Sequence, residues 1–256
     1  TKFINLFGRI LVLHLGLIRK LKEVKPDVIL CEADSHFLGY IKAIFYRTFI
    51  NRNTKLLYWC FIELPGRPNE RSIVHALIKK ITRSFFDGFV LYSTFSKDAL
   101  LKRGYDPESM FIATNVGDTE QHLKNDKEMI LSPEQAKEKL NFPNKFTILY
   151  LGTLDPNKHP DRFLDIAGMA NVSDYNFVLL GSGPMLESLR ERVEKDNLLN
   201  VYLPGRVTAE LPLYMRASDI LLVPGRGGIV VSEAMAYGVP PMVYQADGTE
   251  YDLVKA

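Results

Sequence analysis

The stretch best suited to chemistry is a glycine-rich turn, Gly225-Arg-Gly-Gly228, which follows the apolar run Leu221–Val223. A helix that opens after Gly228 leaves its first backbone N–H groups unpaired, and its dipole favours an anion there. Glycines in the turn let a phosphate approach the backbone closely. Glu233, one helical turn further on, can accept hydrogen bonds from the hydroxyls of a ribose attached to that phosphate, at roughly 1.5–3 kcal/mol each. The alternative interpretation is a plain turn followed by a solvated glutamate.

A second candidate is Lys158, which ends the loop Gly152-Thr-Leu-Asp-Pro-Asn-Lys158 after the apolar run Phe146–Leu151. A lysine at a junction between a loop and a helix can neutralise a diphosphate as a compact point charge. A surface lysine near a helix start is the alternative. Together with the first candidate, the loop predicts an anion site built from backbone amides and one ammonium group.

Histidines and cysteines offer no comparable pattern. His14, His36, His122 and His159 show no ligand or triad spacing, and His75 lies in a segment rich in Ile and Leu that suits a packed histidine. Cys31 and Cys60 form neither a CxxC nor a metal-binding pair, which favours a reducing compartment. We therefore expect no metal, no cofactor and no nucleophilic triad.

The bulk composition suits two modest domains of a globular protein. The chain has 256 residues, of which 46% are hydrophobic and 24% charged, and this excludes disordered and fibrous classes. Residues 1–100 carry 16 Lys and Arg against 8 Asp and Glu, whereas residues 101–256 carry 16 against 22. The basic first part suits an anionic partner such as a membrane surface, although a solvated basic face is the alternative. We expect no nucleic-acid partner.

Strands and helices alternate clearly in the second half. Apolar runs predict strands at 146–151, 175–180, 201–203, 219–223 and 241–244, and amphipathic segments predict helices at 159–170, 185–195, 210–217 and 229–237. Continuous apolar strands alternating with helices indicate a parallel sheet covered on both faces. Ligands of such sheets bind at the carboxyl ends of the strands, where this sequence places Gly152, Gly181 and Gly225.

The first half follows a similar order with less regular segments. The apolar stretch 3–18 contains Arg9 and His14 and is shorter than a membrane span, so it predicts an amphipathic or buried helix. Further strands are predicted at 28–31, 55–62, 88–92 and 110–114, and helices at 37–49, 73–86 and 96–103, the last capped by Ser96. The polar stretch 118–145 predicts a linker, with a helix begun by Ser132 and Pro133 inside it. We place the domains at residues 1–130 and 131–256.

Several stretches together resemble retaining GT-B glycosyltransferases of the family 4 type. In the second half these are 151–158, 178–184, 203–207 and 219–240, the last with the core Glu-Ala-Met-Ala-Tyr-Gly-Val-Pro. In the first half they are Lys25-Pro-Asp-Val-Ile-Leu30, Tyr92-Ser-Thr-Phe-Ser-Lys97 and Thr114-Asn-Val-Gly-Asp-Thr119. The resemblance implies two Rossmann-like domains, each a parallel sheet flanked by helices. We expect both domains to be incomplete and both termini truncated.

The resemblance also implies roles for single residues. Glu233 matches the second glutamate of an E-x7-E motif and would hold the ribose, while Lys158 would contact the donor diphosphate. The remaining donor-binding positions that it implies are Gly152 and Gly181 in the loops, Arg206 and Val207 beside the base, and Gly228, Ile229 and Val230 at the phosphates.

Three positions depart from the family pattern. The first glutamate of E-x7-E is Gly225 here, and the arginine expected after Gly152 is Thr153. Arg226 is adjacent to the vacant carboxylate position and could supply charge to the donor. Where the family often has a histidine, this chain offers Glu63, which could orient an acceptor hydroxyl or cap the following segment.

The resemblance implies transfer of a sugar from a nucleoside diphosphate donor to a glycan or lipid-linked acceptor, with retention of configuration. Fixed amides and Lys158 would stabilise the departing diphosphate. Two alternatives stay open: a non-catalytic GT-B protein that binds a nucleotide-sugar or glycan, and a nucleotide-sugar epimerase. We expect a cytoplasmic location, with peripheral attachment to the inner face of the membrane as a further hypothesis.

Overall fold

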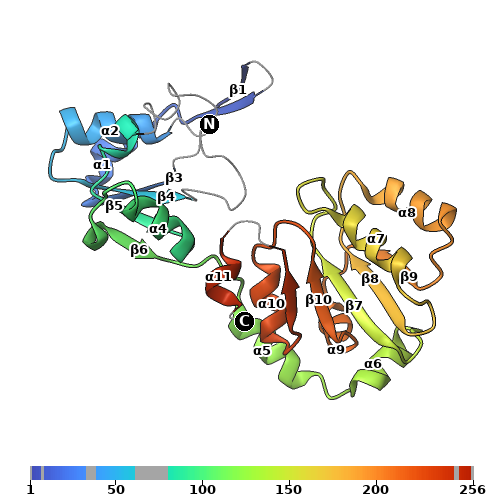
Figure 1. Ribbon diagram of the computed structural model, residues 1–256. Helices are drawn as coiled ribbons and strands as arrows, with labels where there is room; N and C mark the ends of the chain where they lie inside the picture. Colours follow the sequence, from blue (N-terminus) through green and yellow to red (C-terminus); the bar gives the residue numbers. More distant parts are fainter. Residues whose placement is uncertain (1, 7–8, 33–38, 61–79, 245–247, 255–256) are drawn as a thin grey trace. The chain divides into compact units, whose positions relative to one another are not determined.

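The computed structural model describes residues 2–6, 9–32, 39–60, 80–244 and 248–254. Contacts along the chain group it into two compact units, Thr1–Thr114 and Asn115–Ala256. Both units are α/β with parallel sheets, as the sequence predicts (Figure 1).

The first unit contains a four-stranded parallel sheet in the order β3-β4-β5-β6. Its strands are β3 (Val28–Glu32), β4 (Lys55–Cys60), β5 (Gly88–Leu91) and β6 (Met110–Ile112). Its described helices include α1 (Leu17–Val24), α2 (Gly39–Phe49), α4 (Thr94–Leu101) and the short η1 (Pro107–Ser109). Helix α2 packs on β3, β4 and α1, and α4 packs on β5 and β6, so buried side chains such as Leu56 and Leu91 form the core between them.

The first predicted helix, at 3–18, is wrong. Strands β1 (Lys2–Leu6) and β2 (Arg9–Leu13) pair there as an antiparallel hairpin, with Lys2 opposite Leu13 and Leu6 opposite Arg9. Periodicity cannot separate a short apolar strand from a buried helix segment, and Gly8 in the middle of the run disfavours a helix. Helix formation begins only at Leu17.

Helix α4 begins earlier than predicted because its cap is Ser93 rather than Ser96. The Ser93 hydroxyl accepts a hydrogen bond from the backbone N–H of Ser96 at 3.3 Å. Both serines fit the capping pattern in the sequence, and only the extended backbone at Ser93 identifies it as the cap.

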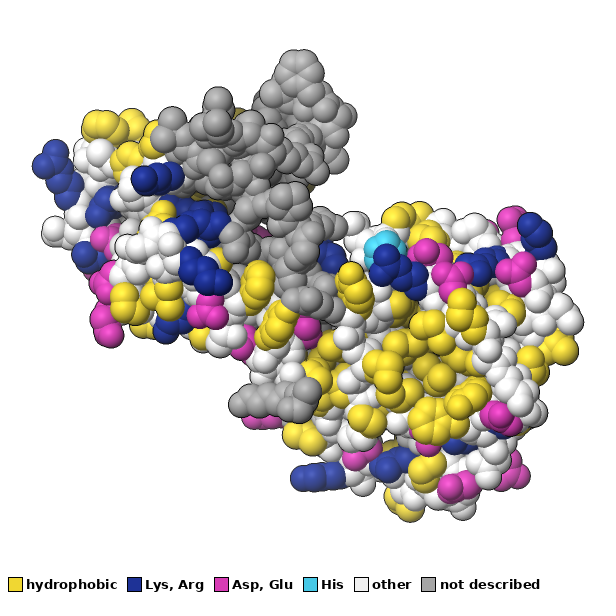
Figure 2. All heavy atoms as spheres, viewed as in Figure 1, with side chains coloured by type: hydrophobic (Ala, Val, Ile, Leu, Met, Phe, Trp, Pro, Cys, Tyr) yellow, Lys and Arg dark blue, Asp and Glu magenta, His cyan; other side chains and the backbone are white. Residues whose placement is uncertain are grey.

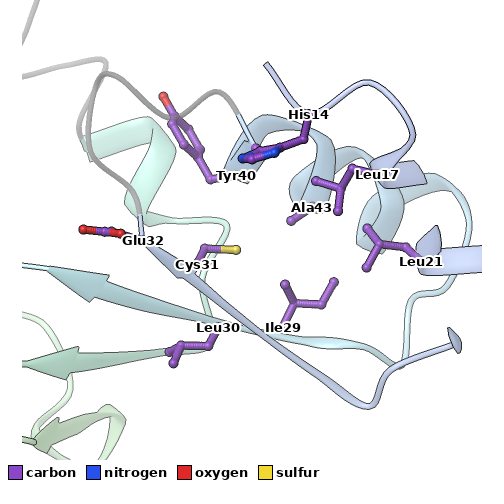
Figure 3. A pocket seen from close by; sticks show the side chains of 10 residues that line it. His14, Leu17, Leu21, Ile29, Leu30, Cys31, Glu32, Tyr40 and Ala43 are labelled. Carbon is purple, nitrogen blue, oxygen red and sulfur yellow. The ribbon is translucent and has the colours of Figure 1, made fainter. Parts of the chain in front are cut away.

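An apolar hollow of about 310 Å³ lies between α1, α2 and β3 (Figure 3). Leu17 and Leu21 line it from α1, Ala43 from α2, and Ile29 and Cys31 from β3. Burial raises the pKa of the Cys31 thiol to about 11, so this group is a neutral packing residue at physiological pH.

The second unit is built on a five-stranded parallel sheet in the order β11-β10-β7-β8-β9 (Figure 1). Its strands are β7 (Phe146–Leu151), β8 (Tyr175–Leu180), β9 (Val201–Gly205), β10 (Ile220–Val223) and β11 (Pro241–Val243). All five lie where the apolar runs predict them, within one or two residues at each end.

Alternate residues of the strands bury two different faces of this sheet. On β7, Leu149 belongs to one core cluster and Tyr150 to another. On β8, Val178 and Leu180 lie in the first cluster, whereas Leu179 lies in the second. Helices α9 (Leu211–Arg216) and α10 (Val230–Ala236) contribute to the first cluster, and α7 (Pro160–Met169) and α8 (Leu186–Lys195) to the second. A short helix, α11 (Glu250–Leu253), follows β11.

The polar stretch predicted as a linker folds in large part as two helices. Helix α5 (Thr119–Glu128) packs on α10, and α6 (Pro133–Lys139) packs on α9. The predicted cap of α6 is confirmed, because the Ser132 hydroxyl accepts from the backbone N–H of Gln135 in a capping box. The domain boundary after residue 130 stays a prediction.

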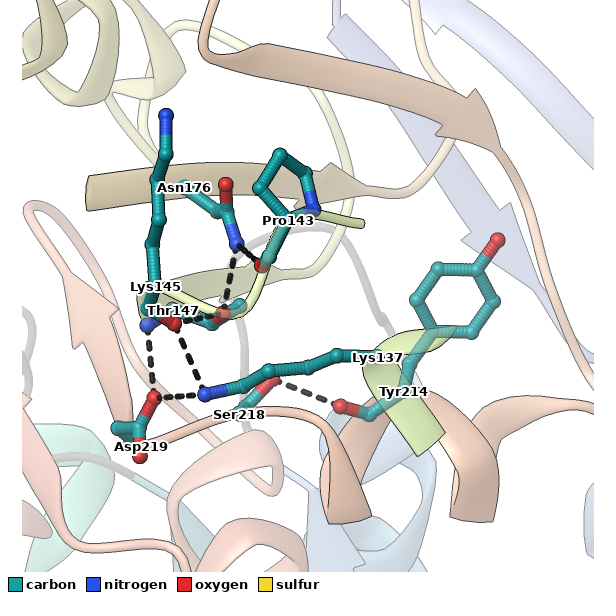
Figure 4. A network of polar contacts seen from close by, with 8 residues as sticks. All are labelled: Lys137, Pro143, Lys145, Thr147, Asn176, Tyr214, Ser218 and Asp219. Atoms are coloured by element: carbon teal, nitrogen blue, oxygen red, sulfur yellow. Dashed lines mark hydrogen bonds and ion pairs between the residues drawn. The ribbon is translucent and has the colours of Figure 1, made fainter. Parts of the chain in front are cut away.

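A buried lysine of α6 forms polar contacts with the amino-terminal end of the sheet (Figure 4). Lys137 Nζ donates to Asp219 Oδ2 at 2.9 Å and to the carbonyl oxygen of Lys145 at 2.8 Å. The backbone N–H of Thr147 donates to the same Asp219 oxygen at 2.7 Å. This contact set lies at the start of β7 and just before β10, opposite the strand ends where ligands bind.

Candidate functional site

The loops after β7, β8 and β9 are joined at the carboxyl ends of these strands. The Gly152 N–H donates to Leu180 O at 3.1 Å, and the Gly181 N–H donates to Gly205 O at 2.9 Å. A Cβ atom at Gly181 would collide with the carbonyl oxygen of Gly152, and its φ of +152° also favours glycine. Glycine is therefore required at position 181 for the loops to close into one surface.

The turn after β10 lies directly against the loop that carries Lys158. The Arg226 N–H donates to Asn157 O at 3.3 Å. A Cβ atom at Gly225 would lie 2.5 Å from both the carbonyl carbon and the oxygen of Lys158. Real Cβ atoms do not approach so closely, so this backbone has no room for a side chain at position 225.

Unpaired amides and an ammonium group meet at this turn. In the described part of the chain, the backbone N–H groups of Gly227, Gly228, Ile229 and Val230 make no hydrogen bond. Lys158 Nζ donates to the carbonyl oxygen of Gly227 at 2.8 Å and lies 3.8 Å from where a Cβ of Gly228 would be. Four N–H groups beside one cation form a place for an anion with several acceptor oxygens, such as a diphosphate.

Glu233 lies one turn into α10, and its side chain is 16% exposed. Its Oε1 atom lies 3.6 Å from Nε2 of His122, a residue of α5. The His122 side chain is 17% exposed. The Gly117 N–H donates to the hydroxyl of Ser232 at 3.1 Å, so the segment before α5 is fixed to α10 next to this carboxylate. The site thus includes a carboxylate in a partly buried position.

The other predicted donor-binding residues are placed as follows. Thr153 is exposed, and its carbonyl oxygen accepts from the Tyr150 hydroxyl at 3.1 Å. Arg206 is exposed immediately after β9, whereas Val207 packs against the core. The Arg226 side chain is half-buried and makes no ion pair or hydrogen bond with the described residues. Of the phosphate-turn residues, Ile229 is exposed and Val230 is half-buried at the first position of α10.

Some predictions of the sequence analysis concern residues that the structure does not describe. Glu63, the predicted acceptor-side residue, His36 and His75 lie outside the described residues, as do residues 73–79 of the helix predicted at 73–86. Among the residues that are described, no group of three or more His, Cys, Asp or Glu side chains could hold a metal ion.

His122 is the site residue that sequence reasoning missed. It has no motif around it and lies 111 positions before Glu233, so only the packing of α5 on α10 brings the two side chains together. The local sequence indicates only that His122 is the fourth residue of α5, after the capping residue Asp118.

Parallel sheets flanked by helices, with glycine-lined loops at the strand ends, define an α/β protein with Rossmann-like domains. The solved structures that this chain resembles are GT-B glycosyltransferases with two such domains. The family model described as glycosyl transferases group 1 matches residues 132–256, which include the whole anion site.

Three similar proteins illustrate the match. An uncharacterized 41.2 kDa protein in the cps region of Klebsiella pneumoniae is 30% identical over 237 residues, 89% of this chain and 63% of that protein. Anabaena Alr3699/HepE in complex with UDP is 19% identical with a TM-score of 0.71, covering 93% of this chain and 65% of that one. The lipopolysaccharide outer core galactosyltransferase WaaB is 17% identical with a TM-score of 0.68, covering 94% and 62%. This chain thus spans less than two thirds of these proteins.

Proposed function

We propose that the chain is the greater part of a glycosyltransferase that takes a sugar from a nucleoside diphosphate donor. The observation that carries the proposal is the convergence of Lys158 Nζ with the unpaired amides of 227–230 at one turn. Such a group stabilises a diphosphate most when negative charge develops on it, as happens when the bond to the sugar breaks. Glu233 binds the ribose hydroxyls of the donor. The acceptor oxygen bonds to the anomeric carbon on the face that the diphosphate leaves, its proton passes to the departing diphosphate, and the anomeric configuration is retained.

The acceptor in this proposal is a glycan or a lipid-linked sugar. Two of the similar proteins support it by description, one from a cps region and one a lipopolysaccharide galactosyltransferase. UDP is the first nucleotide to test because it is the ligand of the Anabaena structure.

Lys158→Ala tests the anion site directly. Titration calorimetry with UDP, GDP and ADP first identifies the nucleotide that the protein binds. Loss of one charge-assisted contact is expected to weaken that binding about 10- to 100-fold. Lys145→Ala is the matched control, because Lys145 Nζ also donates to a backbone carbonyl at 2.8 Å but lies just before β7, at the other end of the sheet. Equal affinities in the wild type and both variants, or no binding of any nucleotide, would refute the proposal.

Turnover separates this function from the two alternatives. A transferase forms a new glycosidic bond with a supplied acceptor, and NMR of the product reports its anomeric configuration. A non-catalytic protein binds the nucleotide-sugar without product, and an epimerase changes the sugar while it is still attached to the nucleotide. Each outcome assigns one of the three activities.

We also propose that the outer surface of α1 and α2 contacts an anionic membrane. Arg19 and Lys20 on α1 have side chains that are largely exposed. Ile41, Phe45 and Phe49 on α2 follow a helical spacing of four and are exposed, with the two phenylalanine rings 5.0 Å apart. Figure 2 shows hydrophobic side chains over α2 with Lys and Arg side chains beside them. Aromatic side chains next to cations suit the headgroup region of an anionic bilayer.

Vesicle sedimentation tests this surface. A Phe45→Ser/Phe49→Ser variant is expected to bind vesicles containing phosphatidylglycerol several-fold more weakly than the wild type, because it loses the inserted rings. Phe111→Ser is the control, since Phe111 is similarly exposed but lies on β6. Equal binding by the double variant and the control would contradict the proposal. Among the described residues, no helix is long and apolar enough to span a bilayer.

A further inference from the structure

The Glu233 carboxylate has a single described partner. Within the described residues, His122 is the one side chain within ion-pair range of it, at 3.6 Å between Nε2 and Oε1. This distance is longer than a hydrogen bond, so the contact orients the carboxylate electrostatically. Both side chains are mostly buried, so the surrounding water screens the contact only in part.

His122 is itself held by a short series of polar contacts between α5 and α10. Its Nδ1 atom lies 3.3 Å from the Tyr237 hydroxyl, and its ring centroid lies 5.3 Å from that of Tyr237. Asn125 Nδ2 donates to the same hydroxyl oxygen at 3.3 Å. When the Tyr237 O–H donates to Nδ1, the proton of the neutral imidazole lies on Nε2, facing Glu233.

We propose that His122 is a positioning residue for the donor, holding one carboxylate oxygen of Glu233 so that the other meets the ribose hydroxyls. The inference rests on the proposed function, and it concerns a residue that does not itself touch the nucleotide. A free glutamate side chain samples several rotamers and must be ordered when the ligand binds. Holding the glutamate side chain in one conformation before the ligand arrives lowers the conformational entropy lost on binding, and this strengthens binding.

The contacts of the neighbouring residues support this role. A Cβ atom at Gly117 would lie 3.3 Å from Cγ of Glu233, so the segment before α5 limits the carboxylate on one side while His122 limits it from α5. The carboxylate therefore has few directions left in which to turn.

The test compares a ligand that has ribose hydroxyls with one that lacks them. Calorimetry measures the affinities of the nucleoside diphosphate found in the screen above and of its 2′,3′-dideoxy analogue. The proteins are the wild type, Glu233→Gln, His122→Phe, His122→Gln and the Glu233→Gln/His122→Phe double variant. Phe keeps the ring that packs on Tyr237 and loses both nitrogens, whereas Gln keeps an N–H donor. Thermal melting of each variant reports whether it is folded.

The expected result is a loss of about 5- to 10-fold for the ribonucleotide in His122→Phe, with the affinity for the dideoxy analogue unchanged. His122→Gln should recover most of the loss. In the Glu233→Gln background, His122→Phe should have no further effect, because both act on the same hydroxyls.

Three results would overturn the inference: equal losses for both ligands, a His122→Phe variant that binds like the wild type, or a wild type that does not distinguish the ligands. In each of these the nucleotide still binds, so the proposed transfer from a nucleoside diphosphate donor survives, but the third result also removes the ribose contact assigned to Glu233. Absence of any nucleotide binding by the wild type refutes the proposed function instead, and the role of His122 with it.

Discussion

Substituting Gly225 by glutamate would complete the E-x7-E pattern that the sequence resemblance implies, and the structure predicts that it damages the site. A Cβ at this position would lie 2.5 Å from the carbonyl carbon and oxygen of Lys158 and 2.9 Å from Asn157 O. Ordinary contacts begin at about 3.4 Å, so the turn and the Lys158 loop must separate by close to 1 Å. That separation also breaks the hydrogen bond from the Arg226 N–H to Asn157 O.

The expected loss of stability combines two effects. Forcing extra atoms into a packed contact costs about 1–3 kcal/mol. Losing the backbone hydrogen bond adds about 0.5–1.5 kcal/mol. The total is about 1.5–4.5 kcal/mol of unfolding free energy, which is a large share of the stability of a typical domain. Binding should suffer as well, because a shift of about 1 Å at Lys158 moves the ammonium away from the amides that it accompanies.

Urea unfolding and nucleotide calorimetry measure the two effects in the same preparations. Gly225→Ala carries the Cβ alone and should lose most of the stability that Gly225→Glu loses. Gly168→Ala is the control for an added methyl group that fits: Gly168 lies in α7, and its Cβ would meet Leu198 at 3.7 Å, an ordinary contact, so this variant should be at least as stable as the wild type. The reasoning fails if Gly225→Ala unfolds at the same urea concentration as the wild type, or at a higher one. A Gly225→Glu variant with undiminished nucleotide affinity and faster turnover would contradict it too.

Two further predictions concern groups away from the anion site. Lys137→Met removes the buried partner of Asp219 and should lower the unfolding free energy by about 2–3 kcal/mol. This is the low end for a buried ion pair, because the Asp219 side chain is 33% exposed. Chemical denaturation measures the loss, and a value below about 0.5 kcal/mol would contradict a stabilising ion pair. Burial raises the pKa of the Cys31 thiol from 9.0 to about 11, so the stability due to its protonated form is complete below pH 9 and is lost as the pH rises from 9 to 11. Comparing wild type with Cys31→Ala across this range should show a steeper fall in the wild type, and parallel curves would disprove the raised pKa.

The sequence predicted most of the second unit because its signals are local. Each strand there is a continuous apolar run, and each helix has an apolar side, so both faces of a parallel sheet can be inferred from adjacent residues. Gly152, Gly181 and Gly225 mark the strand ends by their type alone. The opening hairpin was mistaken for a helix because an apolar run of a few residues fits either structure equally well.

The tertiary structure decided what the local signals left open. Gly225 and Lys158, in two loops 67 positions apart, approach so closely that the backbone has no room for a side chain at position 225. The contact between His122 and Glu233 depends on how α5 packs against α10. Amino-acid type and spacing therefore determined which residues could bind a diphosphate and a ribose. Only the packing of separate segments determined which side chains surround and orient them, because distances across the chain are set by the fold and have no trace in the local pattern.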